Sequence, residues 1–214
     1  MNFFGHVARR RQHLRTTLSS AHSFQALEES CAPSYVHSNL AAAWVAWYRL
    51  FRSARYFRRY GSGPQVLDFG AGTGELAQLL PTGTQYSFAE ETDFLANYIA
   101  AHVSGSVRVG GDALPVAAYD GVFALDSLEH NADPVPLLAA LHRSLKPTGI
   151  FILSGPTESW VYRLGRMLAG FSGHYHETNI YRLETLAEAL FERVAVARVP
   201  WFTPLFRITV WRPK

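Results

Sequence analysis

Glycines at every second position follow an apolar run that ends in a carboxylate. Asp68 closes the run, and Gly70, Gly72 and Gly74 come after it. Glycine has no Cβ, so such a loop lets backbone N–H groups approach a ligand closely at the start of a helix. A dinucleotide-binding fingerprint would need a third glycine where Glu75 stands. The stretch therefore predicts a cradle for a nucleotide-like ligand, but not the fingerprint of hydride-transfer enzymes.

Three histidines could act as a general base, because an imidazole titrates near neutral pH. His130 follows a second apolar run, and it could equally well orient its own loop. His174 and His176 flank Tyr175, so that on an extended segment both would point the same way. Together with Glu177 they would supply only half of a metal site, and we expect no metal.

Alternating strands and helices are expected to position these side chains. Apolar runs predict strands at 65–69, 85–89, 106–110, 121–125 and 149–154. Helical patterns between most of them lie at about 74–80, 92–102 and 134–145. This alternation predicts an α/β fold with a doubly wound, mostly parallel sheet, in which ligands bind at the carboxyl ends of the strands.

The pattern changes after residue 155. Residues 156–182 are rich in Tyr, Arg and His and predict an inserted helix and loop. A helix is expected at 185–193, followed by strands at 194–199 and 206–211 that pair antiparallel. The sheet would then end in a strand that runs against its neighbours.

The first 60 residues carry nine Arg and two Glu, which makes them the basic part of the chain. Asn39 is expected to cap a helix at 40–60. Its pattern places Trp44, Trp47 and Phe51 on one face, and it places Arg49, Arg52 and Arg59 on a neighbouring face. Two interpretations stay open: a lid with its arginines outward, or an element that lies on an anionic membrane surface.

The order of motifs over residues 64–155 resembles the class I S-adenosylmethionine-dependent methyltransferases. The similarity is to enzymes that methylate small molecules, such as those of ubiquinone biosynthesis. Five stretches carry it: Asp68–Gly74, Glu90, Gly111–Pro115, Tyr119–His130 and Leu141–Ser154. The resemblance implies a Rossmann-like fold with an antiparallel last strand. It also implies S-adenosylmethionine as the methyl donor and two regions, an N-terminal helical extension (1–60) and a methyltransferase domain (61–214) with a substrate-side insertion at about 156–182.

The resemblance also implies roles for single residues in holding the cofactor. Asp68 would meet its amino group, and Glu90, with Glu91 as the alternative, would accept hydrogen bonds from both ribose hydroxyls. Asp112 would bind the adenine amino group, unless it only caps a turn, and the N–H of Ala113 would reach the ring. The expected cofactor-binding residues are Asp68, Gly70, Ala71, Gly72, Gly74, Glu90, Glu91, Asp112, Ala113, Asp126 and Ser127.

On the acceptor side, Glu129-His130 is similar to the loop that forms the floor beneath the reactive methyl group in many relatives. Asp126 departs from the pattern, because relatives often have an apolar or small polar residue there. The family places its acceptor pocket in the segment after residue 155. We expect catalysis by His176, His174 or His130, and substrate binding by Glu129, Tyr162, Arg166 and Tyr175.

The function expected from this resemblance is O- or N-methylation (EC 2.1.1.-) of a small-molecule or lipid-linked acceptor. One alternative is a non-catalytic S-adenosylmethionine- or nucleotide-binding protein with a regulatory or assembly role. The other is a nucleic-acid methyltransferase, against which the lack of an Asn-Pro-Pro-Tyr-like or Asp-Pro-Pro-Tyr-like tetrapeptide argues. A single cysteine, Cys31, and the lack of a long apolar run predict a cytoplasmic protein, with peripheral contact to a membrane through residues 40–60 left open.

Overall fold

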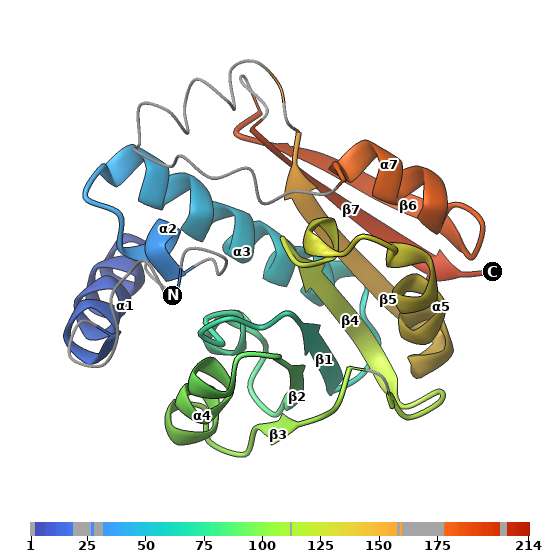
Figure 1. The fold of residues 1–214 in the computed structure, drawn as a ribbon, viewed down its shortest axis with the longest axis horizontal. Coiled ribbons are helices and arrows are strands. Elements are labelled where there is room, and N and C mark those ends of the chain that lie inside the picture. Colours follow the sequence, from blue (N-terminus) through green and yellow to red (C-terminus); the bar gives the residue numbers. More distant parts are fainter. Residues whose placement is uncertain are drawn as a thin grey trace.

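A seven-stranded sheet forms the centre of the molecule (Figure 1). The computed structural model describes residues 3–18, 27, 32–111, 113–157, 159, 178–201 and 205–214. Their strands are β1 (Gln65–Phe69), β2 (Gln85–Ala89), β3 (Val107–Arg108), β4 (Tyr119–Leu125), β5 (Leu145–Pro156), β6 (Phe191–Val199) and β7 (Phe206–Pro213). The strand order is β3-β2-β1-β4-β5-β7-β6.

Strands β1 to β5 pair in parallel, and β7 runs antiparallel to both β5 and β6. This confirms the predicted doubly wound sheet and the antiparallel pairing of the last two strands. The strand order reverses at β1, which lies between β2 and β4. Ligands of such sheets bind at this reversal, just beyond the carboxyl ends of the strands.

Helices cover both faces of the sheet. They are α1 (Phe3–Leu18), α2 (Ala32–Val36), α3 (Leu40–Tyr60), α4 (Asp93–His102), α5 (Pro134–Ser144) and α7 (Ile180–Ala187), with short 3₁₀ turns η2 (Ala77–Leu79) and η3 (Leu128–His130). Successive strand residues point to opposite faces. Accordingly, Val66 packs in the core that contains α1, α2 and α3, while Leu67 packs in the core of α5 and α7.

Helix α3 forms as the sequence predicts. The Asn39 side chain accepts hydrogen bonds from the N–H groups of Ala41 and Ala42, and the helix ends at Tyr60. Trp47 of the expected aromatic stripe is fully buried, whereas Trp44 and Phe51 are half-buried. Two further helices, α1 and α2, precede it within the basic segment.

The expectation that the arginines of α3 face outward is wrong for Arg49. Only 1% of its surface is exposed, and its guanidinium forms an ion pair with Asp126. The charge is tolerated in the core because a carboxylate from the loop after β4 compensates it.

Two other helix predictions are corrected. Residues 74–80 hold only the single 3₁₀ turn η2, because Leu80, which precedes Pro81, is already extended with a φ of −74° and a ψ of 163°. The helix expected at 185–193 lies earlier, at Ile180–Ala187, where Asn179 caps it by accepting from the N–H of Arg182. Phe191 already belongs to β6, because its ring is buried against Phe151 at 5.1 Å.

Among the described residues, no helix combines the length and apolarity that crossing a bilayer requires.

Candidate functional site

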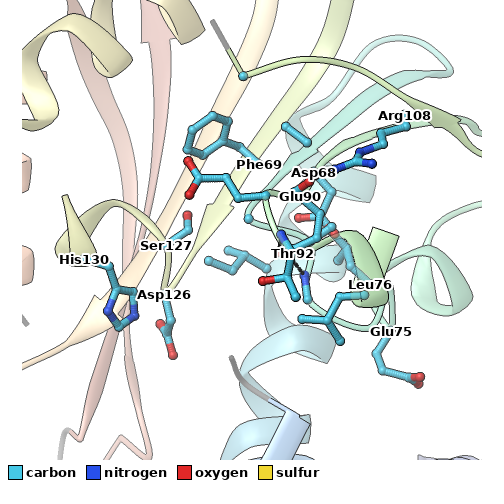
Figure 2. Close-up of a pocket in the computed structure, with 18 of the residues that line it drawn as sticks. Asp68, Phe69, Glu75, Leu76, Glu90, Thr92, Arg108, Asp126, Ser127 and His130 are labelled. Carbon is cyan, nitrogen blue, oxygen red and sulfur yellow. Dashed lines mark hydrogen bonds between the residues drawn. The ribbon is translucent and has the colours of Figure 1, made fainter. Parts of the chain in front are cut away.

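A cavity of about 900 Å³ lies at the point where the strand order reverses. Its walls come from the loop after β1, the end of β2, the stretch after β3 and the loop after β4. Figure 2 shows the labelled side chains in two groups. Asp68, Glu90 and Arg108 lie on one side, and Asp126, Ser127 and His130 lie on the other. The carboxyl ends of parallel strands therefore bring distant parts of the sequence to one place, as the alternation predicts.

The glycine loop after β1 has a backbone that favours glycine. Gly70, Gly72 and Gly74 have φ values of +72°, +58° and +71°. A Cβ on Gly70 would come within 2.3 Å of the Ser127 Cβ, and one on Gly74 within 3.1 Å of Ile99. An added Cβ on Gly72 would meet no protein atom within 4 Å. Gly70 and Gly74 thus allow the loop to pack closely against Ser127 and Ile99. Gly72 leaves its side of the loop open at the cavity.

Glu90 is tied to this loop through its carboxylate. One oxygen accepts the Gly72 N–H at 2.8 Å, and the other accepts the Thr92 N–H at 3.0 Å. Each carboxylate oxygen keeps a further lone pair for a ligand hydroxyl. Glu91 also lines the cavity but is exposed. The two backbone hydrogen bonds give Glu90 a defined position for binding.

Asp68 lies at the end of β1 and is 3% exposed. Burial raises its pKa to about 7, and the nearby charge of Glu90 acts in the same direction. The Tyr86 hydroxyl donates to the carboxylate at 2.6 Å, which lowers the pKa and limits the rise. A cationic ligand group beside Asp68 would stabilise its ionised form.

The loop after β4 forms the opposite wall. Asp126 has a φ of +54°, and its N–H donates to the Ser154 carbonyl at 2.9 Å. The hydroxyl of Ser127 is buried and makes no hydrogen bond within the described part of the chain. His130 lines the cavity as well. Glu129 is fully buried outside the cavity wall, and its carbonyl accepts the Thr178 N–H at 3.3 Å.

Several predicted site residues lie outside the described residues, and their roles stay predictions: Asp112, Tyr162, Arg166, His174, Tyr175 and His176. Ala113 is exposed, and its N–H donates to the Gly110 carbonyl at 3.4 Å. It is not part of the cavity wall, whereas Gly110 and Gly111 are. Within the described ranges, no cluster of three residues is arranged to hold a metal ion.

Sequence reasoning missed the contribution of the N-terminal segment. Leu27, Tyr35 and Leu50 line the cavity. Arg49 is paired with Asp126, and Arg10 is paired with Glu75. The unusual residues Asp126 and Glu75 were visible in the sequence, but their partners are 77 and 65 positions away in the chain. Nothing in the local pattern could identify them.

The site fits a cofactor that carries a ribose and a positively charged group. Gly72 leaves room for close approach, Glu90 offers acceptors for a diol, and the buried Ser127 hydroxyl lacks a partner among the described residues. The described lining residues include five carboxylates (Asp68, Glu75, Glu90, Glu91 and Asp126) and one arginine, Arg108. Arg10 and Arg49 neutralise Glu75 and Asp126, so Glu90, Glu91 and the ionised form of Asp68 are the charges that favour a cationic ligand.

Comparisons with known proteins agree with this geometry. A family model described as a methyltransferase domain matches residues 41–194. No match was found among the curated proteins. The fold is similar to that of N-methyltransferase NodS from Bradyrhizobium japonicum, solved with S-adenosylhomocysteine, with a TM-score of 0.65, 12% identity and coverage of 79% of this chain and 87% of that one.

Two other solved structures share the fold. One is a SAM-dependent methyltransferase from Aquifex aeolicus, with a TM-score of 0.59, 17% identity and coverage of 77% of this chain and 91% of that one. The other is 1,6-didemethyltoxoflavin-N1-methyltransferase from Burkholderia thailandensis, with a TM-score of 0.58, 24% identity and coverage of 77% and 78%. At these identities the likeness establishes the fold alone.

Proposed function

This chain belongs to the family of methyltransferase domains, and we propose that it transfers the methyl group of S-adenosylmethionine to an oxygen or nitrogen atom of a small-molecule or lipid-linked acceptor. The observation that carries the proposal is the cavity at the strand reversal, where Gly72 and Glu90 are joined by a hydrogen bond and Asp68 lies alongside. When bound, S-adenosylmethionine supplies a methyl group that its sulfonium centre has already activated. Much of the catalysis can therefore come from holding two reactants in line.

The described residues have distinct tasks in this scheme. The Glu90 carboxylate would accept the ribose hydroxyls, because Gly72 and Thr92 hold it in place while leaving lone pairs available. Asp68 would face the amino group of the donor. The Ser127 hydroxyl, which has no partner among the described residues, would gain one when the donor binds.

An oxygen or nitrogen acceptor can require removal of a proton. Among the described residues of the cavity wall, His130 is the only histidine. It is our candidate for the base from this part of the chain, beside the predicted His174 and His176. Glu129 is buried behind the wall and would act on the position of its loop.

A lipid-linked acceptor is supported by the outer side of α1 and α3. The described residues 3–18 and 32–60 contain no Asp or Glu. Arg52 bonds the hydroxyls of Tyr48 and Tyr56, at 3.4 Å and 3.3 Å. Phe4 is 73% exposed and stands beside Phe3, whose ring meets that of Tyr48. Aromatic rings with arginines suit contact with an anionic bilayer surface.

Titration calorimetry with S-adenosylmethionine and S-adenosylhomocysteine tests the donor site. We expect both to bind the full chain, and we expect Glu90→Ala to weaken binding strongly. Glu91→Ala is the matched control, because its exposed carboxylate has the same charge but no hydrogen bond to the glycine loop among those described. Failure of the wild-type chain to bind either compound would refute the proposal.

Transfer itself requires a second experiment. The chain is incubated with cofactor carrying a labelled methyl group and a metabolite and lipid extract, and labelled products are identified by mass spectrometry. A labelled small molecule or lipid supports the enzyme. Donor binding without any labelled product would favour a non-catalytic binding protein, and label in nucleic acid would favour the nucleic-acid alternative.

A further inference from the structure

A buried arginine of the N-terminal segment is paired with the loop that follows β4. The Arg49 side chain is 1% exposed and does not reach the cavity wall. Its guanidinium forms an ion pair with Asp126, which does line the cavity, and its central carbon lies 5.0 Å from the ring centre of Phe206. Arg49 therefore joins α3 to the end of β4 and the start of β7.

The position of Asp126 determines the position of its neighbour. Asp126 has a φ of +54°, in the left-handed region that is uncommon for residues other than glycine, although Asp and Asn adopt it more often than most. Ser127 follows directly, and its Cβ occupies the space that a side chain on Gly70 would need. Movement of Asp126 would thus displace both the loop after β4 and the first turn of the glycine loop.

A second ion pair holds the other end of the glycine loop. Arg10 of α1 donates to both carboxylate oxygens of Glu75, at 2.9 Å and 2.6 Å. The Glu75 side chain is fully buried, and it follows Gly74 directly. In Figure 2 its carboxylate points away from the other labelled side chains. Arg10 lies outside residues 41–194, which the family model matches.

We propose that Arg10 and Arg49 are positioning residues for the methyl donor, which act through Glu75 and Asp126 and hold the two loops that surround it. The inference rests on the proposed function, because it concerns the donor site. Leu27, Tyr35 and Leu50 of the same N-terminal segment complete the cavity wall. The described residues 3–18, 27 and 32–60 accordingly contribute to the donor site, although neither arginine touches the cavity.

The physical reason is the cost of an unpaired buried charge. Removal of one partner from a buried ion pair leaves the other without compensation, so that the remaining carboxylate turns toward water. Asp126 lines the cavity, which gives its carboxylate room to turn. The loops would then move out of the arrangement that the donor requires.

The test compares Arg49→Met and Arg10→Met with two matched controls. Arg55→Met removes an exposed arginine from α3, and Arg9→Met removes an exposed one from α1. For each full-length variant, S-adenosylhomocysteine binding is measured by calorimetry, and thermal unfolding is measured without ligand. We expect Kd to rise at least about tenfold in the first two variants and to stay within about twofold of wild type in the controls.

A double variant separates positioning from a general loss of stability. Arg49→Met/Asp126→Asn removes both charges, and such replacements often recover the stability that a single removal costs. Under the proposal, the unfolding temperature recovers while Kd stays high, since the tie between α3 and the loop remains absent. Recovery of both together would mean that the pair acts only on stability, and it would overturn the proposal.

Three further outcomes are decisive. If Arg49→Met does not fold, the Arg49→Met/Asp126→Asn protein takes its place in the comparison, and a wild-type Kd in that protein would contradict the role. If wild-type protein binds S-adenosylhomocysteine and both methionine variants bind it equally well, the positioning role is wrong and the proposed function stands. If the wild-type protein does not bind S-adenosylhomocysteine, both the positioning role and the proposed function are wrong.

Discussion

At the scale of single residues, the donor site depends on a glycine that faces open space. Gly72 has a positive φ, and a Cβ there would meet no protein atom within 4 Å. We expect Gly72→Val to abolish detectable binding of S-adenosylhomocysteine, because the side chain would occupy the space of the donor.

Gly83→Val is the control for backbone strain. Gly83 also has a positive φ, of +87°, and open space around it, but it lies in the turn before β2. Both variants should lose roughly 1–2 kcal/mol of stability from the left-handed conformation. Only Gly72→Val should lose binding, measured by calorimetry. Equal loss in both would show that strain, and not occupation of the cavity, is responsible.

Asp68 should make donor binding depend on pH. Its pKa is raised to about 7 by burial, so the free protein holds a proton there at lower pH, and binding of a cationic group must release it. Affinity for S-adenosylhomocysteine should rise between pH 5.5 and 7.5, by up to about tenfold per pH unit below the pKa. The α-amino group of the ligand stays protonated over that window.

Two variants check the origin of this dependence. Asp68→Asn should bind more weakly and without the rise. Tyr86→Phe removes the hydrogen bond that lowers the pKa of Asp68, so its profile should shift to higher pH. If the affinity of the wild-type protein does not change with pH, the assignment of Asp68 to the amino group of the donor is wrong. The stability of the free protein should depend on pH in the opposite direction. Because the pKa of Asp68 is higher in the folded protein than in the unfolded chain, the folded state is favoured at low pH, and this stabilisation is lost as the pH rises toward 7.

At the scale of elements, α3 connects the basic segment to the site. Its cap is Asn39, whose side chain accepts two backbone N–H groups. Asn39→Ala should lower the free energy of unfolding by about 1 kcal/mol, or the unfolding temperature by roughly 2–4 °C. Asn39→Ser, which can still cap, should stay close to wild type. Thermal unfolding of the three proteins distinguishes them, and similar losses for Ala and Ser would show that the cap is not the cause.

The elements also show where pattern reading succeeds. Strands β1 and β2 match their predicted bounds, because buried strands are short apolar runs bounded by turn residues. The stretch 74–80 was predicted as a helix, because its apolar spacing is helical, but Leu80 is extended before Pro81 and only one 3₁₀ turn forms. The segment after Ala187 was also misassigned, since Phe191 enters the sheet through contacts with β5 that the local pattern does not contain.

At the scale of the whole molecule, the uneven distribution of charge suggests how the protein meets a surface. We expect the chain to sediment with vesicles that contain phosphatidylglycerol, and Arg52→Glu/Arg59→Glu to reduce the bound fraction several-fold. The aromatic and basic side of α3 would lose its attraction for anionic lipid, at about 1 kcal/mol per arginine.

Arg143→Glu/Arg212→Glu is the matched control for this experiment. It changes the net charge by the same amount at exposed positions on α5 and β7. Equal sedimentation of the two double variants would attribute any binding to net charge alone. Vesicles of phosphatidylcholine, which carry no net charge, should bind none of these proteins, and high salt should release the wild type.

The sequence by itself determined the fold class, the order of the motifs and the residues of the glycine loop that line the cavity. These properties are local: apolar periodicity, a glycine spacing, and a carboxylate at the end of a strand each occupy a few consecutive residues. Glu90 could be preferred over Glu91 by register, and the structure places the Glu90 carboxylate against the loop. Its role in binding stays a prediction.

Only the tertiary structure decided how the N-terminal segment is used. Arg49 lies in a helical pattern that places it beside exposed arginines, yet it is buried because Asp126 meets it across the fold. Arg10 and Glu75 likewise pair over 65 positions. An arginine can be buried when an acidic side chain from a distant part of the sequence lies next to it, because that ion pair offsets the cost of removing the guanidinium from water. Because the local sequence does not show that partner, the glycine loop and Glu90 of the candidate site could be proposed from the sequence, whereas the ion pairs with Arg10 and Arg49 could not.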